Sequence, residues 1–456
     1  MLSWPRLDPA TARPRIPSRF ALLAAGEIEG SPLDYEKLDR SPHVRRIPLA
    51  RRFPEERRDA LTRAEFDGCS ILSALAAGDP SEVAYLVQEE GPLRDGLAME
   101  AARFGSPFFT AYDGATVSKE AAGAVRELAG LTREGSAADV AIAATSLEDY
   151  ARCPFSFFMR RVLGIEPLEE PEEAAAPTPL ERGELYHAVL DAFLKRARQA
   201  GRLPLSGDHL DALLRAAEET AASGRWTFAA RPGSRDLELL ALRRNLALWL
   251  WSEVTGGSTL RPAYFEARFG GQARPDDDTE MSLAAPVPFE AAGGVRVGFR
   301  GKIDRIDIDP ESGAAVVIDY KTGSPDPGAD ALFDRGRRLQ LPVYILAAQA
   351  MLDAAGAAGR VEGAEYRYVT RAEKREARRL SRKQLDGSLD DFRKAVGLIV
   401  KGISEGMFFA WPEENRCDCC DYRSACGAGS VVLALARMKQ GDRRAKFFTE
   451  GLAAIE

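Results

Sequence analysis

The chain has 456 residues, of which 62 are basic and 69 acidic, giving a formal net charge of −7. Apolar residues make up 45% and charged residues 29%, a composition that is typical of soluble globular proteins and excludes a disordered chain. No apolar run reaches the roughly 18 residues that span a bilayer. The N-terminal sequence MLSWPRLDPATARPR has no apolar signal segment, so we expect a cytoplasmic protein of two or three domains with no membrane contact. The mild acidity argues against a non-specific polycation but permits a local basic groove for nucleic acid.

Helices dominate the predictions for the first half of the chain. In chain order they are expected over 18–26, over most of 36–135, over 146–164 and 180–200, and as two helices within 208–253. The third begins at Ser146, where Asp149 three residues later completes a capping-box pattern, and it contains Cys153. Residues 166–179 are acidic and rich in proline and alanine, which is typical of an exposed linker.

The second half carries the β signals. Strands are predicted over 264–270, 295–309, 314–323 and 364–370, and helices over 337–352 and 386–405. The residues 295–309 alternate apolar and polar, the sequence PESG forms a turn, and 314–323 resembles a buried strand. This order of elements predicts an α/β core, a central sheet flanked by helices, with extensive helical additions.

Two carboxylates and a lysine are expected at one end of this sheet. Asp319 and Lys321 lie two apart on a strand and therefore share a face. A hairpin would bring Asp304 on the preceding strand close to Asp319. Buried carboxylates are costly without a cation, and carboxylate oxygens suit Mg²⁺ or Mn²⁺. The arrangement favours metal-assisted hydrolysis of a phosphodiester, although a lone D-x-K is more often a surface ion pair.

Two helices add polar residues that could face the same place. Gln340 and Tyr344 lie one helical turn apart, and both side chains can donate to a phosphate. In the helix 180–200, the rare histidine His187 lies on one stripe with Glu184 and Asp191, opposite an apolar face. Taken alone, that stripe favours a solvent-facing surface over a site.

The six cysteines are unevenly placed. Cys417, Cys420 and Cys426 offer three thiolates within ten residues, and a fourth would come from Cys69, Cys153 or Cys419. In a cytosolic protein such clustering indicates metal binding, not disulfides. Four thiolates can hold zinc or an iron–sulfur cluster. The spacing lacks a second C-x-x-C knuckle, which weakens the zinc interpretation.

Several motifs, in this order along the chain, resemble a known family. The segments RGELYH (182–187), GKIDRID (301–307), VIDYKTG (317–323) and QLPVY (340–344) resemble the RecB-like branch of the PD-(D/E)XK nucleases. The segment CPFSFF (153–158), with the terminal cysteines, resembles the iron–sulfur nuclease domain of AddB-type subunits of bacterial helicase–nucleases. The resemblance implies a restriction-endonuclease-like core over about residues 140–430.

The resemblance also implies roles for single residues. It assigns His187, Asp304, Asp319 and the main-chain carbonyl of Tyr320 as ligands of Mg²⁺ or Mn²⁺, Lys321 as the catalytic lysine, and Gln340 and Tyr344 as its Q-x3-Y motif in the active site. Glu266 matches the family more weakly. Cys153, Cys417, Cys420 and Cys426 match the four ligands of a structural 4Fe-4S cluster, which leaves Cys69 and Cys419 without a role.

Four parts of the chain are expected from these motifs. They are a remnant of a helicase-like region (1–35), a mostly helical region (36–140), the nuclease domain closed by the cluster (141–430), and a helical tail (431–456). The sequence has no phosphate-binding G-x-x-x-x-G-K-S/T loop, so we expect no ATPase activity from this chain.

The function expected from the resemblance is that of a metal-dependent deoxyribonuclease. It would degrade single-stranded DNA ends as an exonuclease in recombination and double-strand-break repair, with a helicase or helicase–nuclease subunit as a partner. If the basic segment 371–383 is helical, Arg371, Arg375, Arg378 and Arg382 share a face that could follow a phosphate backbone. The alternative is a non-catalytic DNA-binding or scaffold module of a helicase–nuclease complex.

Overall fold

The computed structural model divides the chain into two compact units, residues 1–98 and 99–456. The described residues are 15–44, 53–54, 56–77, 79–89, 91–116, 118, 120, 122–124, 141–166, 177–223, 234–324, 331–357, 359–374, 377–413, 417–427 and 429–455. The first unit contains the helices α1 (Arg19–Glu29), α2 (Tyr35–Arg40), α3 (Arg63–Ala77) and α4 (Ala84–Glu89). The helix α5 (Gly91–Gly105) crosses the boundary between the units. The helical character predicted for this part of the chain is therefore present.

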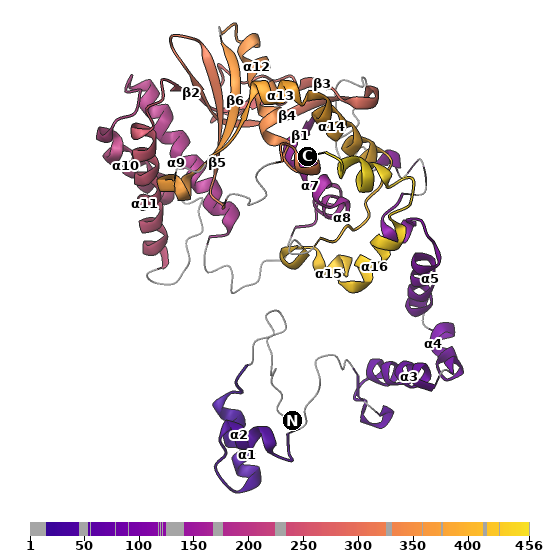
Figure 1. Ribbon diagram of the computed structural model, residues 1–456. Helices are drawn as coiled ribbons and strands as arrows, with labels where there is room; N and C mark the ends of the chain where they lie inside the picture. The colour runs from indigo at the N-terminus through magenta and orange to yellow at the C-terminus, as the bar shows by residue number, and fades with distance from the viewer. Residues whose placement is uncertain are drawn as a thin grey trace. The chain divides into compact units, whose positions relative to one another are not determined.

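A mixed sheet organises the second unit (Figure 1). Its strands within the described residues are β1 (Ala141–Ala143), β2 (Arg261–Phe269), β3 (Val287–Glu290), β4 (Arg296–Ile308), β5 (Ala314–Lys321), β6 (Arg360–Tyr368) and β7 (Ala377–Ser381). The long strand β4 pairs with β1 and β3 along its first half and with β2 and β5 along its second half. The β1–β4 and β5–β6 pairs are parallel and the other pairs antiparallel, which confirms the predicted α/β fold.

The turn between β4 and β5 sets the register of the functional strands. Asp309 accepts hydrogen bonds at Oδ1 from the backbone N–H groups of Glu311 and Ser312, at 3.0 and 2.9 Å. Gly313 follows with φ of 72°, a conformation that glycine adopts without steric cost. The turn therefore fixes which residues of β4 and β5 lie opposite each other.

Helices cover both faces of the sheet. They are α9 (Pro179–Gln199), α10 (Leu210–Ala222) and α11 (Ser234–Thr255) on one face, and α7 (Ala144–Arg152), α12 (Gln340–Ala354) and α14 (Leu389–Ser404) on the other. Alternation along β5 explains the two layers, because Ile318 and Tyr320 pack with the first group and Val317 with the second. Figure 1 shows α9, α10 and α11 gathered beside β2 and β5. No helix in the described segments is long and apolar enough to cross a membrane.

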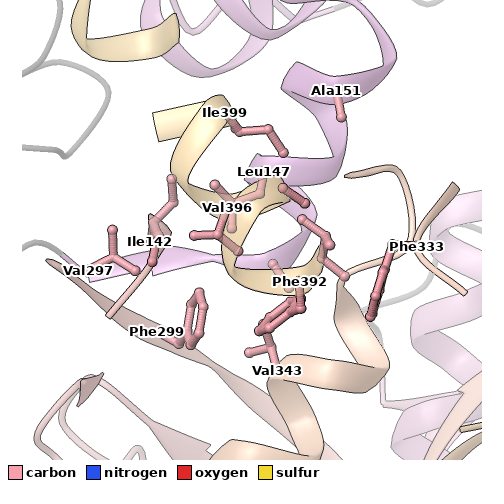
Figure 2. Close-up of a cluster of buried hydrophobic side chains, with 14 of the residues drawn as sticks. Ile142, Leu147, Ala151, Val297, Phe299, Phe333, Val343, Phe392, Val396 and Ile399 are labelled. Carbon is pink, nitrogen blue, oxygen red and sulfur yellow. The ribbon is translucent and has the colours of Figure 1, made fainter. Parts of the chain in front are cut away.

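The second layer contains the larger apolar core (Figure 2). Phe299 of β4 and Phe392 of α14 have ring centroids 6.3 Å apart, and Val343 of α12 and Leu147 of α7 belong to the same buried cluster. Each of these four side chains is fully buried. The cluster joins α7, α12 and α14 to β4, so that these elements support one another around the site described below.

The helix predicted from Ser146 to Gly164 is wrong in both its start and its continuity. The helix α7 begins at Ala144 after Ala143, without a side-chain cap, and Asp149 forms an ion pair with Arg161. The helix ends before Cys153, whose φ and ψ of −161° and 113° are extended. Pro154 disfavours a helical conformation in the residue before it. Two short helical pieces follow: α8 (Pro154–Phe157) and the π-helical turn η4 (Phe158–Val162).

The basic segment is not one helix. It forms the 3-10 element η9 (Val369–Lys374), the strand β7 and the short helix α13 (Arg382–Gly387). The strand β7 pairs with β6 and buries Leu380, while Ser381 caps α13 by accepting the Gln384 N–H. Pairing with β6 thus outweighs the helical alternative for this segment. The sequence analysis did not predict the strand β7, nor the short strands β1 and β3. The helices α15 (Arg423–Cys426) and α16 (Ser430–Lys439) and the π-helical turn η11 (Phe447–Leu452) complete the described C-terminal part.

Candidate active site and cysteine cluster

Two aspartates lie side by side at the centre of the site. Arg305 of β4 is opposite Ile318 of β5 in the antiparallel register, so Asp304 and Asp319 occupy neighbouring positions on adjacent strands. Both side chains are buried, with residue exposures of 8% and 3%. Asp304 Oδ2 accepts the backbone N–H of Tyr320 at 2.8 Å. The hairpin predicted from the sequence therefore brings the two carboxylates together.

A lysine and a glutamine form a ring of polar contacts around Asp319. The Lys321 Nζ lies 2.6 Å from Asp319 Oδ2 and donates to Gln340 Oε1 at 2.8 Å. The Gln340 Nε2 donates to Asp319 Oδ1 at 3.0 Å and to the Tyr344 hydroxyl at 2.9 Å. The ring of Tyr366 on β6 lies 4.7 Å from Lys321 Nζ. Sequence reasoning brought together four of these residues and missed Tyr366, because its position depends on β6 pairing with β5.

The histidine of α9 faces the site and not the solvent. The His187 Nδ1 lies 3.3 Å from Asp304 Oδ1, and the Nε2 lies 3.0 Å from the Tyr320 carbonyl oxygen. Glu184 on the same stripe is exposed, and Asp191 pairs with Lys195 at 2.8 Å. The solvent interpretation of the stripe is therefore wrong for His187, because this part of α9 faces Asp304 of β4 and the Tyr320 carbonyl of β5.

A glutamate on β2 completes a compact set of possible metal ligands. One ligand atom from each of His187, Glu266 and Asp304 lies within 4.8 Å of the others. Glu266 is 7% exposed and has a φ of 54°, an uncommon value for a residue other than glycine. Its carboxylate forms an ion pair with Lys302. The sequence indicated Glu266 only weakly, since a single glutamate within a strand carries no local signal of its own.

The titration behaviour of these groups reflects burial and crowding. Burial raises the pKa of Asp319 to about 6; Lys321 opposes the rise and Asp304 adds to it. Burial and repulsion by Asp304 raise the pKa of Glu266 to about 7. Burial alone would lower the pKa of His187, but the attraction of Asp304 outweighs it and raises that pKa to about 9. Mutual repulsion among buried carboxylates is relieved by a bound cation, so the donor set fits a divalent metal.

Two cysteine-bearing segments of the second unit, around Cys153 and around Cys420, lie near each other. Burial raises the pKa of the Cys153 thiol, backbone N–H groups of Trp411, Ser156 and Phe155 that bond to the sulfur oppose the rise, and repulsion from the neighbouring Cys420 sulfur adds to it. The Tyr422 hydroxyl donates to the Ile165 carbonyl at 2.7 Å. These contacts join segments about 260 residues apart, which is the closure that a shared metal cluster would make.

The individual cysteines differ in what the structure describes. Cys153, Cys417, Cys420 and Cys426 are each half-buried. A set of four partly buried thiols from two segments fits a four-thiolate group. The side chain of Cys419 lies outside the described residues. Cys69 belongs to the first unit, where its thiol donates to the Pro54 carbonyl at 3.0 Å.

The three described arginines among the four proposed to contact DNA lie on three different elements and do not share one helical face. Arg371 donates to Ser324 Oγ at 2.7 Å from η9, and Arg378 donates to the Ala331 carbonyl at 2.5 Å from β7. Arg382 on α13 pairs with Asp386 at 2.8 Å. Arg375 lies outside the described residues. Contact with DNA by these arginines stays a prediction.

The mixed α/β fold, with buried carboxylates and a lysine on adjacent strands, is the one expected of a PD-(D/E)XK nuclease. A comparison with protein families agrees. The family model of the PD-(D/E)XK nuclease superfamily matches residues 141–427, and the chain belongs to this superfamily. This confirms the resemblance that the motifs indicated.

Several similar curated proteins share the name of an ATP-dependent helicase/deoxyribonuclease subunit. An ATP-dependent helicase/deoxyribonuclease subunit from Lacticaseibacillus casei (strain BL23) is 31% identical over 220 residues, which cover 45% of this chain and 17% of that protein. Two subunits of the same name, from Moorella thermoacetica and Carboxydothermus hydrogenoformans, are 27% and 30% identical over 225 and 213 residues, covering 46% and 45% of this chain and 18% of each relative. The match thus spans less than one fifth of the length of these relatives.

Proposed function

We propose that the chain is a divalent-metal-dependent deoxyribonuclease that hydrolyses phosphodiester bonds at single-stranded DNA ends. The observation that carries the proposal is the ring of contacts joining Asp319, Lys321 and Gln340 beside the ligand set of His187, Glu266 and Asp304. Because the carboxylates are buried against one another, a bound cation would balance their charges and offer a positive site to the DNA phosphate. Membership of a nuclease superfamily supports the same reaction.

The residues of the site divide into metal-holding and substrate-directed groups. His187, Asp304, Asp319 and the Tyr320 carbonyl would hold Mg²⁺ or Mn²⁺, with Glu266 as a further candidate. When bound, such a cation supplies charge stabilisation to the phosphodiester and activates the attacking water. The Lys321 ammonium presents a positive charge beside the same carboxylates, where it orients the water or neutralises the phosphate. Gln340 holds both Lys321 and Asp319, and Tyr344 holds the Gln340 amide.

The proposed setting is recombination and double-strand-break repair. The similar proteins are named as helicase/deoxyribonuclease subunits, which supports DNA as the substrate and a helicase or helicase–nuclease subunit as a partner. Arg371, Arg375, Arg378 and Arg382 remain candidates for contacts with the DNA backbone, which as a polyanion binds dispersed arginines as well as aligned ones.

Metal dependence tests the proposed reaction directly. We expect the purified chain to degrade end-labelled linear single-stranded DNA with Mg²⁺ or Mn²⁺ and to lose this activity in EDTA, because the carboxylates cannot act on the phosphate alone. Circular single-stranded DNA should resist, since an exonuclease needs an end. Cleavage of the circular DNA would show that the chain acts as an endonuclease and not as an exonuclease. DNA binding without cleavage in either metal would favour the non-catalytic scaffold module.

We further propose that Cys153, Cys417, Cys420 and Cys426 hold a structural 4Fe-4S cluster. The convergence of the two cysteine segments supports this assignment, and the cluster would close the nuclease domain over residues 141–430. The proposed chemistry is assigned to other residues, so the cluster would have a structural role.

Single-cysteine variants distinguish the proposed cluster ligands from the additional cysteine Cys419. We expect Cys153→Ser to lose the cluster's iron and acid-labile sulfide and to unfold at lower temperature, because a four-thiolate site lacks a ligand. The matched variant Cys419→Ser should keep iron, sulfide and melting temperature. Equal iron in wild type and Cys153→Ser, or stoichiometric zinc in a colourless wild-type protein, would contradict the cluster.

A further inference from the structure

A buried glutamate of α7 binds the start of the helix that carries the catalytic amide. The Glu148 Oε1 accepts the backbone N–H groups of Leu339 and Gln340 at 2.7 and 2.9 Å. The residue is 5% exposed and comes from a position 191 residues before Leu339. The first N–H groups of a helix have no partner within the helix, and Leu339 supplies no side-chain cap. The carboxylate of Glu148 therefore takes the place of a local cap.

The residue held in this way is Gln340, at the centre of the active-site contacts. Its backbone N–H is fixed by Glu148, while its side-chain amide binds both Lys321 and Asp319. An anchored backbone leaves the Gln340 side chain fewer ways to move away from these partners. Glu148 thus acts on the reacting end of β5 through one intervening residue.

The ion pair of Glu148 with Arg152 is the weaker contact. The Arg152 Nη2 lies 3.7 Å from Glu148 Oε2, and its side chain is 48% exposed. Exposed arginines contribute little to stability through such pairs. The main contacts of the Glu148 carboxylate are therefore its two buried hydrogen bonds with the backbone N–H groups of α12.

We propose that Glu148 is a positioning residue of the nuclease reaction, which aligns Gln340, and through it Lys321 and Asp319, by binding the N-terminus of α12. The inference rests on the proposed nuclease function and adds to it a residue outside the ligand set and the Q-x3-Y motif. It also gives α7 two tasks, because Glu148 lies one turn before the C-terminal end of α7 and Cys153 follows that end directly.

Three variants of the full chain test the assignment. Glu148→Ala should lower kcat about 10- to 100-fold, the usual cost of losing a group that orients metal-site residues, with KM for DNA changed less than about twofold. Glu148→Gln keeps an oxygen acceptor for both N–H groups and should restore most of kcat. The control Arg152→Ala should resemble wild type. Mn²⁺ affinity, measured by calorimetry without DNA, should weaken in Glu148→Ala and recover in Glu148→Gln.

A double mutant separates positioning from general damage. In a Gln340→Ala background, adding Glu148→Ala should cost little further kcat, because the path from Glu148 to Lys321 is already broken. Full additivity, a Glu148→Gln variant as poor as Glu148→Ala, or wild-type kcat and Mn²⁺ affinity in Glu148→Ala would each overturn the inference while leaving the nuclease in place. A wild-type chain that neither cleaves DNA nor binds Mn²⁺ would overturn both proposals.

Discussion

Replacing Asp319 by asparagine is expected to reduce metal-dependent DNA cleavage by about three orders of magnitude. The substitution removes a negative charge from the proposed ligand set and from the partner of Lys321 Nζ at 2.6 Å. A metal contributes several kcal/mol of charge stabilisation to such reactions, and about 4 kcal/mol corresponds to a 10³-fold change in rate. Asparagine keeps an oxygen that accepts the Gln340 Nε2, so the fold of the site should persist.

Initial rates on end-labelled single-stranded DNA with Mg²⁺ measure the effect, and a matched variant shows that it is local. Asp353, near the end of α12, is exposed and accepts the Gln349 Nε2 at 2.9 Å. Asp353→Asn makes the same chemical change outside the site and should retain the wild-type rate. If Asp319→Asn kept more than a tenth of the wild-type rate, Asp319 would not be a metal ligand in this reaction.

The parts of the site that could be predicted are those set by local sequence. The hairpin turn at Asp309 and Gly313 fixes the register that pairs Asp304 with Asp319, and strand alternation places Lys321 on the face of Asp319. The positions of Gln340 and Tyr344 follow from one turn of a helix. Short-range patterns were therefore sufficient to bring Asp304, Asp319 and Lys321 together, whereas the family resemblance was needed to place Gln340 and Tyr344 beside them.

The parts that could not be predicted depend on packing between distant segments. Whether His187 faces solvent or Asp304 is decided by how α9 packs on the sheet, which the helical stripe alone does not specify. The strand β7 forms because β6 offers an edge to pair with, although it lies within a basic segment and two of its five residues are arginines. The bonds from Glu148 to the start of α12 join residues far apart in the chain and have no sequence signature.

The second large effect is expected from a residue inside the GKIDRID motif that binds no metal. Arg305 is 2% exposed and donates from Nε and Nη2 to both carboxylate oxygens of Asp307, at 2.5 and 2.7 Å. Its Nη2 also donates to Glu253 of α11 at 2.8 Å, and its Nη1 to the Tyr320 hydroxyl at 3.0 Å. One guanidinium thus joins β4 to α11 and to the ligand-bearing strand β5.

Arg305→Met is expected to lower the free energy of unfolding by about 3–5 kcal/mol, the usual cost of removing one partner of a buried ion pair. The loss arises because Asp307 and Glu253 keep buried charges. Arg367, which donates to Glu253 at 2.5 Å, compensates only part of the lost interaction. The matched variant Arg379→Met, whose side chain is 75% exposed and pairs with Glu365, should cost less than about 1 kcal/mol. Urea unfolding followed by tryptophan fluorescence measures both. Equal stability of the two variants would mean that the Arg305 network does not hold α11 to the sheet, and the alignment of Tyr320 would then rest on apolar contacts such as that with Trp249.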